Sequence, residues 1–229
     1  MELKNKLEIV KNNISLAQKR AGLYNDIEIV AVTKTHSFNI IKKAYDVGFF
    51  SIGENKVQEA LNKFESFKEM PLIKKRFIGH LQSNKLKKCL DIFDTIDSVD
   101  SLKLVKKISR AGESLGKKIP ILLEINTSKE EQKYGFLPTK TEALLPCFEE
   151  IGVEIKGLMT VGPLTQEKKE IRSSFSRLRE FKDKLNSEIN HKKMKTLSMG
   201  MSNDYEIAIE EGSTMIRLGT YLFGKRGIL

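Results

Sequence analysis

Short apolar stretches alternate with amphipathic stretches along almost the whole chain, and this alternation most constrains the fold. Residues 27–32 (IEIVAV) are β-branched and nearly continuous in apolarity, which is typical of a strand buried on both faces. Residues 3–21 carry apolar side chains at three- and four-residue steps and predict an amphipathic helix that ends at Gly22. The strand-then-helix order repeats from there, so the pattern predicts parallel strands connected through helices.

The alternation predicts eight strands with a helical connection between each strand and the next. The predicted strands are 27–32, 49–52, 76–78, 92–96, 120–125, 155–161, 194–197 and 214–218. The predicted helices are 3–21, 37–47, 56–68, 84–90, 101–115, 139–150, 167–189 and 204–211.

Eight such units close naturally into a (β/α)8 barrel of the TIM type, which needs about 200–250 residues as one unit. The chain has 229 residues. We therefore expect the α/β class and a single barrel domain over residues 1–229, with an open doubly wound sheet as the alternative. Since only about ten residues follow the last strand, we expect the helix at 3–21 to occupy the place of the eighth outer helix.

The formal net charge is +10, which raises the question of an anionic partner. The lysines form scattered pairs such as Lys42-Lys43 and Lys87-Lys88, without a basic stripe interleaved with aromatic residues. Nucleic-acid binding is therefore the weaker interpretation, and a small phosphorylated ligand is the stronger one. No 18-residue apolar run and no apolar leader segment occur, so we expect no membrane contact and a cytoplasmic protein.

Metal and redox chemistry have little support in the sequence. Cys89 and Cys147 lie far apart, and neither stands in a CxxC pattern or beside a histidine. We expect no metal site and two buried thiols. His36 and His191 lie in polar segments and are expected at the surface, whereas His80 is a candidate general acid or base.

A barrel places its active groups at the carboxyl ends of its strands. Polar residues recur at those positions in this sequence, although any one of them is ordinary for a loop. They are Lys34, Glu54, Asn55, His80, Gln82, Asn84, Asp97, Ser98, Asn126, Thr127, Thr160, Ser198, Ser202, Arg217 and Thr220.

Lys34 directly follows the apolar run IVAV and is predicted to project from the mouth of a buried strand. Desolvation there lowers the pKa of an ammonium, which suits a lysine that forms a Schiff base with an aldehyde cofactor. The alternative is a lysine whose stem lies along the apolar strand end. Arg217 lies among apolar residues of the last strand and needs a partner, either an ion pair or a bound heterocycle.

The last two strand ends provide a candidate phosphate site. Gly219 and Thr220 offer backbone N–H groups and a hydroxyl, and Ser202 lies in the preceding loop, where Gly200 permits close backbone approach. The alternative for Ser202 is a helix cap. A lysine on the first strand, a phosphate site on the last two and an arginine between them match the aldehyde, phosphate and ring nitrogen of pyridoxal 5′-phosphate (PLP).

The sequence resembles the YggS/PLPBP (PROSC) family of pyridoxal phosphate homeostasis proteins, over nearly its whole length. The resemblance implies a PLP-binding barrel like the N-terminal domain of alanine racemase, with Lys34 as the PLP lysine. It further implies cofactor contacts from Asn55, Ser198, Ser202, Gly219 and Thr220, with Arg217 facing the pyridine nitrogen. His80 stands where many relatives are expected to have a smaller residue. The matching stretches are AVTKT (31–35), IGENKVQEA (52–60), FIGHLQSNK (77–85), IDSVDS (96–101), EINTSKEEQKYGF (124–136), GLMTVGP (157–163) and LSMGMSNDYEIAIEEGSTMIRLGTYLFG (197–224).

Two further expectations concern activity. An arginine opposite the ring nitrogen weakens PLP as an electron sink, and the chain ends without the additional domain that supplies the second catalytic base in alanine racemases. We therefore expect a monomeric PLP carrier or regulator that serves PLP-dependent apo-enzymes. The alternatives are a small amino-acid racemase and a basic nucleic-acid-binding barrel.

Overall fold

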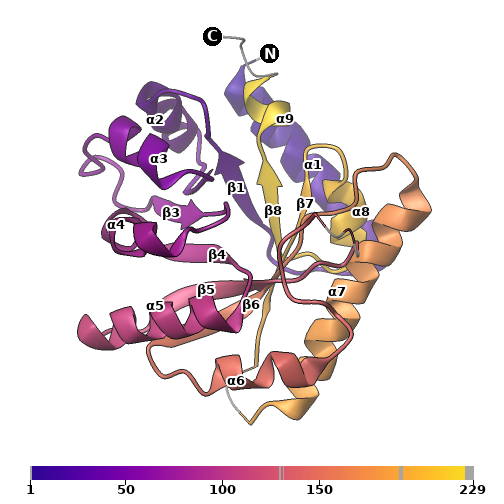
Figure 1. Ribbon diagram of the computed structural model, residues 1–229. Coiled ribbons are helices and arrows are strands. Elements are labelled where there is room, and N and C mark those ends of the chain that lie inside the picture. Colours follow the sequence, from indigo (N-terminus) through magenta and orange to yellow (C-terminus); the bar gives the residue numbers. More distant parts are fainter. Residues whose placement is uncertain (1, 129, 131, 191–192, 225–229) are drawn as a thin grey trace.

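In the computed structural model, which describes residues 2–128, 130, 132–190 and 193–224, parallel strands form a closed barrel with helices around it (Figure 1). Each strand pairs with the next in sequence, and β8 pairs with β1 to close the ring. The predicted barrel is confirmed, and the alternative prediction of an open doubly wound sheet is wrong. The strands are β1 Glu28–Val32, β2 Ser51–Glu54, β3 Lys74–Phe77, β4 Thr95–Val99, β5 Ile119–Glu124, β6 Val153–Met159, β7 Thr196–Met201 and β8 Met215–Leu218.

The helices follow the predicted order, with several shorter than expected. The expected helix over 139–150 is a 3₁₀ turn followed by a single α-turn, and Pro146, which has no N–H, stands at the start of the latter. The α-helices and the 3₁₀ turns (η) are α1 Leu3–Ala21, α2 Phe38–Asp46, α3 Val57–Lys63, η1 Ser83–Lys85, α4 Leu86–Ile92, α5 Leu102–Ser114, η2 Thr141–Ala143, α6 Leu145–Phe148, α7 Lys168–Glu188, α8 Tyr205–Glu210 and α9 Thr220–Phe223.

The start of the fourth strand was predicted wrongly. Ile92, expected to open it, is the last residue of α4, and β4 begins only at Thr95. The Asp94 carboxylate accepts a hydrogen bond from the Lys75 N–H at 2.7 Å and fixes this boundary. Asp97 therefore lies inside the strand rather than after it, and its side chain is buried.

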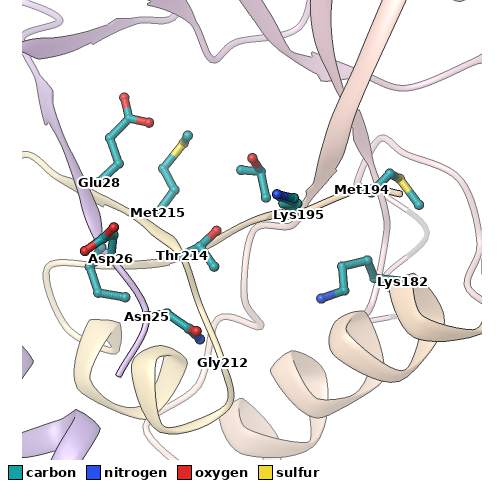
Figure 2. A pocket seen from close by; sticks show the side chains of 11 residues that line it. Asn25, Asp26, Glu28, Lys182, Met194, Lys195, Gly212, Thr214 and Met215 are labelled. Atoms are coloured by element: carbon teal, nitrogen blue, oxygen red, sulfur yellow. The ribbon is translucent and has the colours of Figure 1, made fainter. Parts of the chain in front are cut away.

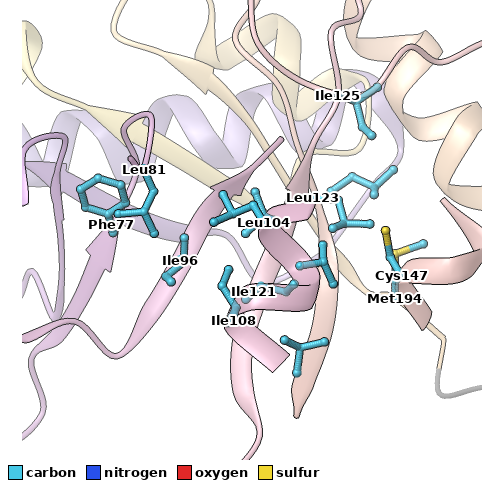
Figure 3. Packing of buried hydrophobic residues seen from close by; sticks show 14 of the residues in the cluster. Phe77, Leu81, Ile96, Leu104, Ile108, Ile121, Leu123, Ile125, Cys147 and Met194 are labelled. Atoms are coloured by element: carbon cyan, nitrogen blue, oxygen red, sulfur yellow. The ribbon is translucent and has the colours of Figure 1, made fainter. Parts of the chain in front are cut away.

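The main apolar core lies between the strands and the outer helices. Phe77, Ile96 and Ile121 come from β3, β4 and β5, and Leu104 and Ile108 of α5 pack against them (Figure 3). Burial of apolar surface of this kind is the principal stabilising contribution to such a barrel.

Helix α1 occupies the place that the sequence predicted for it. Its buried residues Leu7, Val10, Ile14 and Ala17 belong to an apolar cluster with residues of β8, α8 and α9. Asn13 donates a hydrogen bond to the Tyr205 hydroxyl at 2.8 Å, and α1 lies beside α9 in Figure 1. The helix thus completes the outer ring between the last and first strands.

Both cysteines are buried free thiols, as predicted, and burial raises the pKa of Cys89 and of Cys147 to about 12. His36 is half-buried, so part of its side chain lies at the surface as expected; its ring is 5.1 Å from that of Phe223, and burial lowers its pKa. His191 lies outside the described residues. Within the described ranges, no helix is long and apolar enough to span a bilayer, and no three His, Cys, Asp or Glu side chains gather to hold a metal ion.

Candidate functional site

Lys34 lies just beyond the carboxyl end of β1, half-buried at the barrel mouth. Its neighbour Thr33 is completely buried and is bound to the next strand through two contacts. The Thr33 N–H donates to the Gly53 carbonyl at 3.1 Å, and its hydroxyl donates to Glu54 Oε1 at 2.6 Å. The residue immediately before Lys34 is therefore fixed to β2.

Arg217 is buried in β8, as predicted. Its guanidinium donates to Ser198 Oγ on β7 at 2.7 Å and to the Thr160 carbonyl, just after β6, at 2.8 Å. Within the part of the chain that the structure describes, no carboxylate lies within ion-pair distance. Burial lowers the pKa of Arg217, and the negative charges of Asp204 and Glu124 only partly oppose this shift.

Ser202, Gly219 and the start of α9 come together at the neighbouring strand ends. Ser202 Oγ accepts hydrogen bonds from the N–H groups of Gly219 at 3.3 Å and Tyr221 at 3.1 Å. Its hydroxyl proton remains to be donated, and the first N–H groups of a helix have no partner within the helix. A Cβ placed on Gly219 would stand 3.5 Å from Val32 Cβ, so this loop lies against the strand that leads to Lys34.

Ser202 does not cap α8, because the residue that precedes this helix is Asp204; the hydroxyl oxygen of Ser202 instead accepts hydrogen bonds from N–H groups at the start of α9. Asp204 Oδ1 accepts the Met201 N–H at 2.5 Å and closes the loop that carries Ser202. Burial raises the pKa of Asp204.

Asn55 follows the last residue of β2 and is half-buried. Its backbone presses against Gly79, where an added Cβ would lie 2.2 Å from the Asn55 carbonyl oxygen. Among the described residues, no hydrogen bond joins Asn55 to the Arg217–Ser198 pair or to the Ser202 loop. The structure thus brings Arg217 into contact with Ser198, and Ser202 into contact with Gly219. Asn55 lies at the same end of the barrel without a hydrogen bond to either pair.

Glu54, one of the polar residues expected at the strand ends, is the last residue of β2. It is fully buried, and Lys63 of α3 donates to its Oε1 at 2.5 Å. Its Oε2 is the one buried side-chain polar atom of the described residues that has no hydrogen-bond partner. Burial raises the pKa of Glu54 against the effect of Lys63.

The strand-end residue that sequence reasoning missed is Glu124. It closes the apolar run ILLE at the end of β5, the same signal that singled out Lys34. Burial raises its pKa, with Asp100 adding to the shift and Arg217 and His80 opposing it. His80 is exposed, with its ring stacked 3.9 Å from that of Tyr134 and its Nδ1 3.0 Å from Asp100 Oδ2.

A groove of about 740 Å³ opens at the opposite end of the barrel. Figure 2 shows Lys182 of α7 on one side of it and Glu28 and Met215, from the first residues of β1 and β8, on the other. None of the predicted site residues lines this groove. Because barrels carry their active groups at the carboxyl ends of the strands, the mouth is the better candidate.

A family model described as the N-terminal domain of alanine racemase matches residues 6–227. The chain is therefore a barrel protein of this class. An alanine racemase of Clostridium difficile 630, solved with cycloserine, superposes with a TM-score of 0.74 over 96% of this chain and 59% of that one. The identity is 18%, so this likeness concerns the fold alone.

Two closer relatives narrow the class. A pyridoxal phosphate homeostasis protein of Aquifex aeolicus is 37% identical over 223 residues, which are 96% of this chain and 97% of the relative. PipY of Synechococcus elongatus PCC7942, solved with PLP bound, is 34% identical with a TM-score of 0.83 over 97% of this chain and all of that one. This chain belongs to the family of pyridoxal phosphate homeostasis proteins, which confirms the resemblance found in the sequence.

Proposed function

We propose that this protein binds PLP at the barrel mouth, holds it through a Schiff base on Lys34 and serves intracellular PLP homeostasis. The observation that carries the proposal is the pairing of Arg217. A buried guanidinium that is bonded only to neutral oxygens is incompletely compensated, which is costly unless a ligand completes its surroundings. An electron-rich ring nitrogen or an anion meets this need, and PLP carries both.

The remaining residues fit the same ligand. Ser202 retains a hydroxyl proton to donate, and Gly219 and Thr220 stand at the start of α9, so this loop suits the phosphate. Ser198 orients Arg217, Asn55 lies at the rim, and Lys34 comes two residues after Val32, which lies against Gly219. The unpaired Glu54 Oε2 at this same end is a further sign of a site that a bound group completes.

When bound, PLP supplies an aldehyde that condenses with a lysine amine to a C=N bond and water, and a ring that can withdraw electrons. Arg217 is cationic, and a cation that faces the ring nitrogen opposes its protonation and so weakens that withdrawal. We therefore favour a carrier or regulator without turnover, monomeric and cytoplasmic, that exchanges PLP with apo-enzymes. PipY with its bound PLP and the homeostasis proteins among the relatives support the binding of PLP and a role in its homeostasis.

The test is the absorbance spectrum of the purified protein after incubation with PLP and removal of the excess. Wild type is expected to retain a PLP chromophore, and Lys34→Ala is expected to lose the covalent band. Lys103→Ala, at an exposed position of α5, is the matched control and should behave as wild type. A wild-type protein that never retains PLP would contradict the proposal.

The alternatives are separated by two further assays. Chiral analysis of amino acids incubated with the PLP-loaded protein should show no racemisation, and turnover that disappears in Lys34→Ala would establish an enzyme instead. Retention on DNA that falls with salt and ignores PLP would favour nucleic-acid binding.

A further inference from the structure

The residues on the two sides of Lys34 are held by three linked charged side chains, Glu54 and Lys63 on one side and Glu59 on the other. On one side, Thr33 donates through its hydroxyl to Glu54 Oε1 at 2.6 Å, and its carbonyl accepts from Lys63 Nζ at 3.0 Å. Lys63 in turn binds Glu54 Oε1 at 2.5 Å and lies 3.6 Å from Glu59 Oε1. The three side chains are hereafter called the clamp.

On the other side of Lys34, the Thr35 N–H donates to Glu59 Oε1 at 2.5 Å. Thr35 has a φ of +67°, the one positive φ of a non-glycine residue in the described chain. A β-branched residue is strained in this left-handed conformation and keeps it only when its surroundings impose it. The hydrogen bond from the Thr35 N–H to Glu59 is the contact that imposes this conformation.

The Glu54–Lys63 half of the clamp is buried rather than a surface ion pair, whereas the side chain of Glu59 is 27% exposed. The Lys63 side chain is 9% exposed and that of Glu54 is 0% exposed. Surface ion pairs constrain little, whereas buried, charge-assisted hydrogen bonds fix geometry. The backbone at Thr33 is therefore held by buried contacts, and that at Thr35 by the more exposed hydrogen bond to Glu59, on the two sides of the point from which Lys34 projects.

We propose that Lys63, acting through Glu54 and Glu59, is a positioning residue that holds the Lys34 segment in place and thereby slows the release of PLP. The proposal rests on the proposed function of Lys34. Release requires water to add across the C=N bond and to restore the amine and the aldehyde. A lysine held beside the aldehyde recaptures it before it leaves, and recapture depends steeply on orientation. A loosened segment gives the aldehyde more time to escape.

The experiment compares the rate at which bound PLP is lost on dilution and ultrafiltration. Lys63→Met removes the ammonium at similar length and should release PLP about tenfold faster than wild type. Lys63→Arg keeps the charge and should restore most of the retention. Lys56→Met changes an exposed lysine just before the same helix and should release PLP at the wild-type rate.

A second pair of variants reaches the other side of Lys34 and does not depend on the folding of Lys63→Met. Glu59→Leu removes the acceptor for the Thr35 N–H, while Glu59→Gln keeps one. The leucine variant should release PLP several-fold faster than the glutamine variant.

Thermal unfolding of the PLP-free proteins separates positioning from general stability. If Lys63→Met and Glu59→Leu lower the melting temperature but release PLP at the wild-type rate, the clamp is merely structural and the proposal is wrong. If wild type itself takes up no PLP, the proposed function fails first, and the two failures are thus distinguishable.

Discussion

The barrel buries two arginines, one toward each end, and they are paired in opposite ways. Arg76 on β3 binds the carboxylates of Glu28 at 2.8 Å and Asp97 at 3.0 Å, and it also contacts the hydroxyls of Ser51 and Thr95. Burial acts to lower the pKa of Arg76, but the two carboxylates outweigh it and leave the pKa raised. Arg217 is equally buried and bonds only to neutral oxygens, and its pKa is lowered.

The difference distinguishes the amino-terminal end of the barrel, where the buried charge is paired, from the mouth, where we propose that PLP binds. Glu28, Ser51 and Thr95 are the first residues of their strands, so Arg76 closes the amino-terminal end with its charge fully paired. At the mouth, Glu54, Glu124 and Asp204 all have pKa values raised by burial, and Glu54 has an unpaired oxygen. Polar groups left incomplete in a packed barrel are the expected signature of a site that awaits its ligand.

The largest effect is expected at the closed end. Arg76→Met leaves Asp97, which is 1% exposed, as an unpaired buried charge, and should lower the free energy of unfolding by about 3–5 kcal/mol. Urea unfolding measures this loss. Lys74→Met, exposed on the same strand, is the control, and Arg76→Met with Asp97→Asn should recover part of the loss. A change as small as that of the control would remove the distinction between the two ends.

Arg217→Met is the counterpart at the mouth, and its main effect should appear in binding. Replacing a buried, poorly compensated cation by an apolar side chain of similar length often leaves stability nearly unchanged, so the PLP-free protein should unfold within about 1 kcal/mol of wild type. PLP affinity should fall by about tenfold or more, since a charge-assisted contact is lost. Titration of the absorbance with PLP measures the affinity. The reverse outcome, unchanged affinity with a large loss of stability, would show that Arg217 is structural.

Ser202→Ala should weaken PLP binding by about tenfold, the effect of one hydrogen bond to a charged group. Stability should change by less than about 1 kcal/mol, because the N–H groups of Gly219 and Tyr221 lie at the partly exposed start of α9, where water can replace the hydroxyl. Asn203→Ala, an exposed neighbour, is the control. Equal affinities for the two variants would exclude Ser202 from the phosphate site.

The smallest expected effect concerns the pH dependence of stability. Burial raises the pKa of Asp204 in the folded protein above its unfolded value, so the folded state binds the proton more tightly. The contribution is fully present below the unfolded pKa, and is lost as pH rises through the folded pKa. Wild type should therefore lose stability relative to Asp204→Asn as pH rises through the mildly acidic range. Unfolding in urea at several pH values gives this difference, and an opposite slope would contradict a pKa of Asp204 that burial raises.

The order of the elements could be predicted from the sequence because buried parallel strands are apolar on both faces and leave a clear pattern. The first and last residues of the helices and strands were harder to predict. The apolar pair Ile92 and Phe93 fits a helix end as well as a strand start, and the choice depends on Asp94 and its contact with Lys75. The prediction of one continuous helix over 139–150 took no account of Pro146, which stands at the start of α6.

The candidate site was predictable where a strand end alone reveals it, as for Lys34 and Ser202. Contacts between distant residues left no such signal. Asp97 was expected in a loop but pairs with Arg76, 21 residues away, inside the barrel. Glu54 was expected as a polar residue at a strand end, yet it binds Lys63 and Thr33 because the return of the chain through α3 brings Lys63 back to the end of β2. Glu124 is a polar residue at the carboxyl end of an apolar strand, so the same criterion applied to every strand would have identified it.

The central claim is that the mouth binds PLP covalently through Lys34. Borohydride reduction of the PLP-loaded protein, followed by proteolysis and mass mapping, tests it most directly. The account predicts one peptide that carries the mass of the reduced adduct on Lys34, and loss of that adduct in Lys34→Ala. An adduct scattered over surface lysines, or found equally in Lys34→Ala, would contradict it.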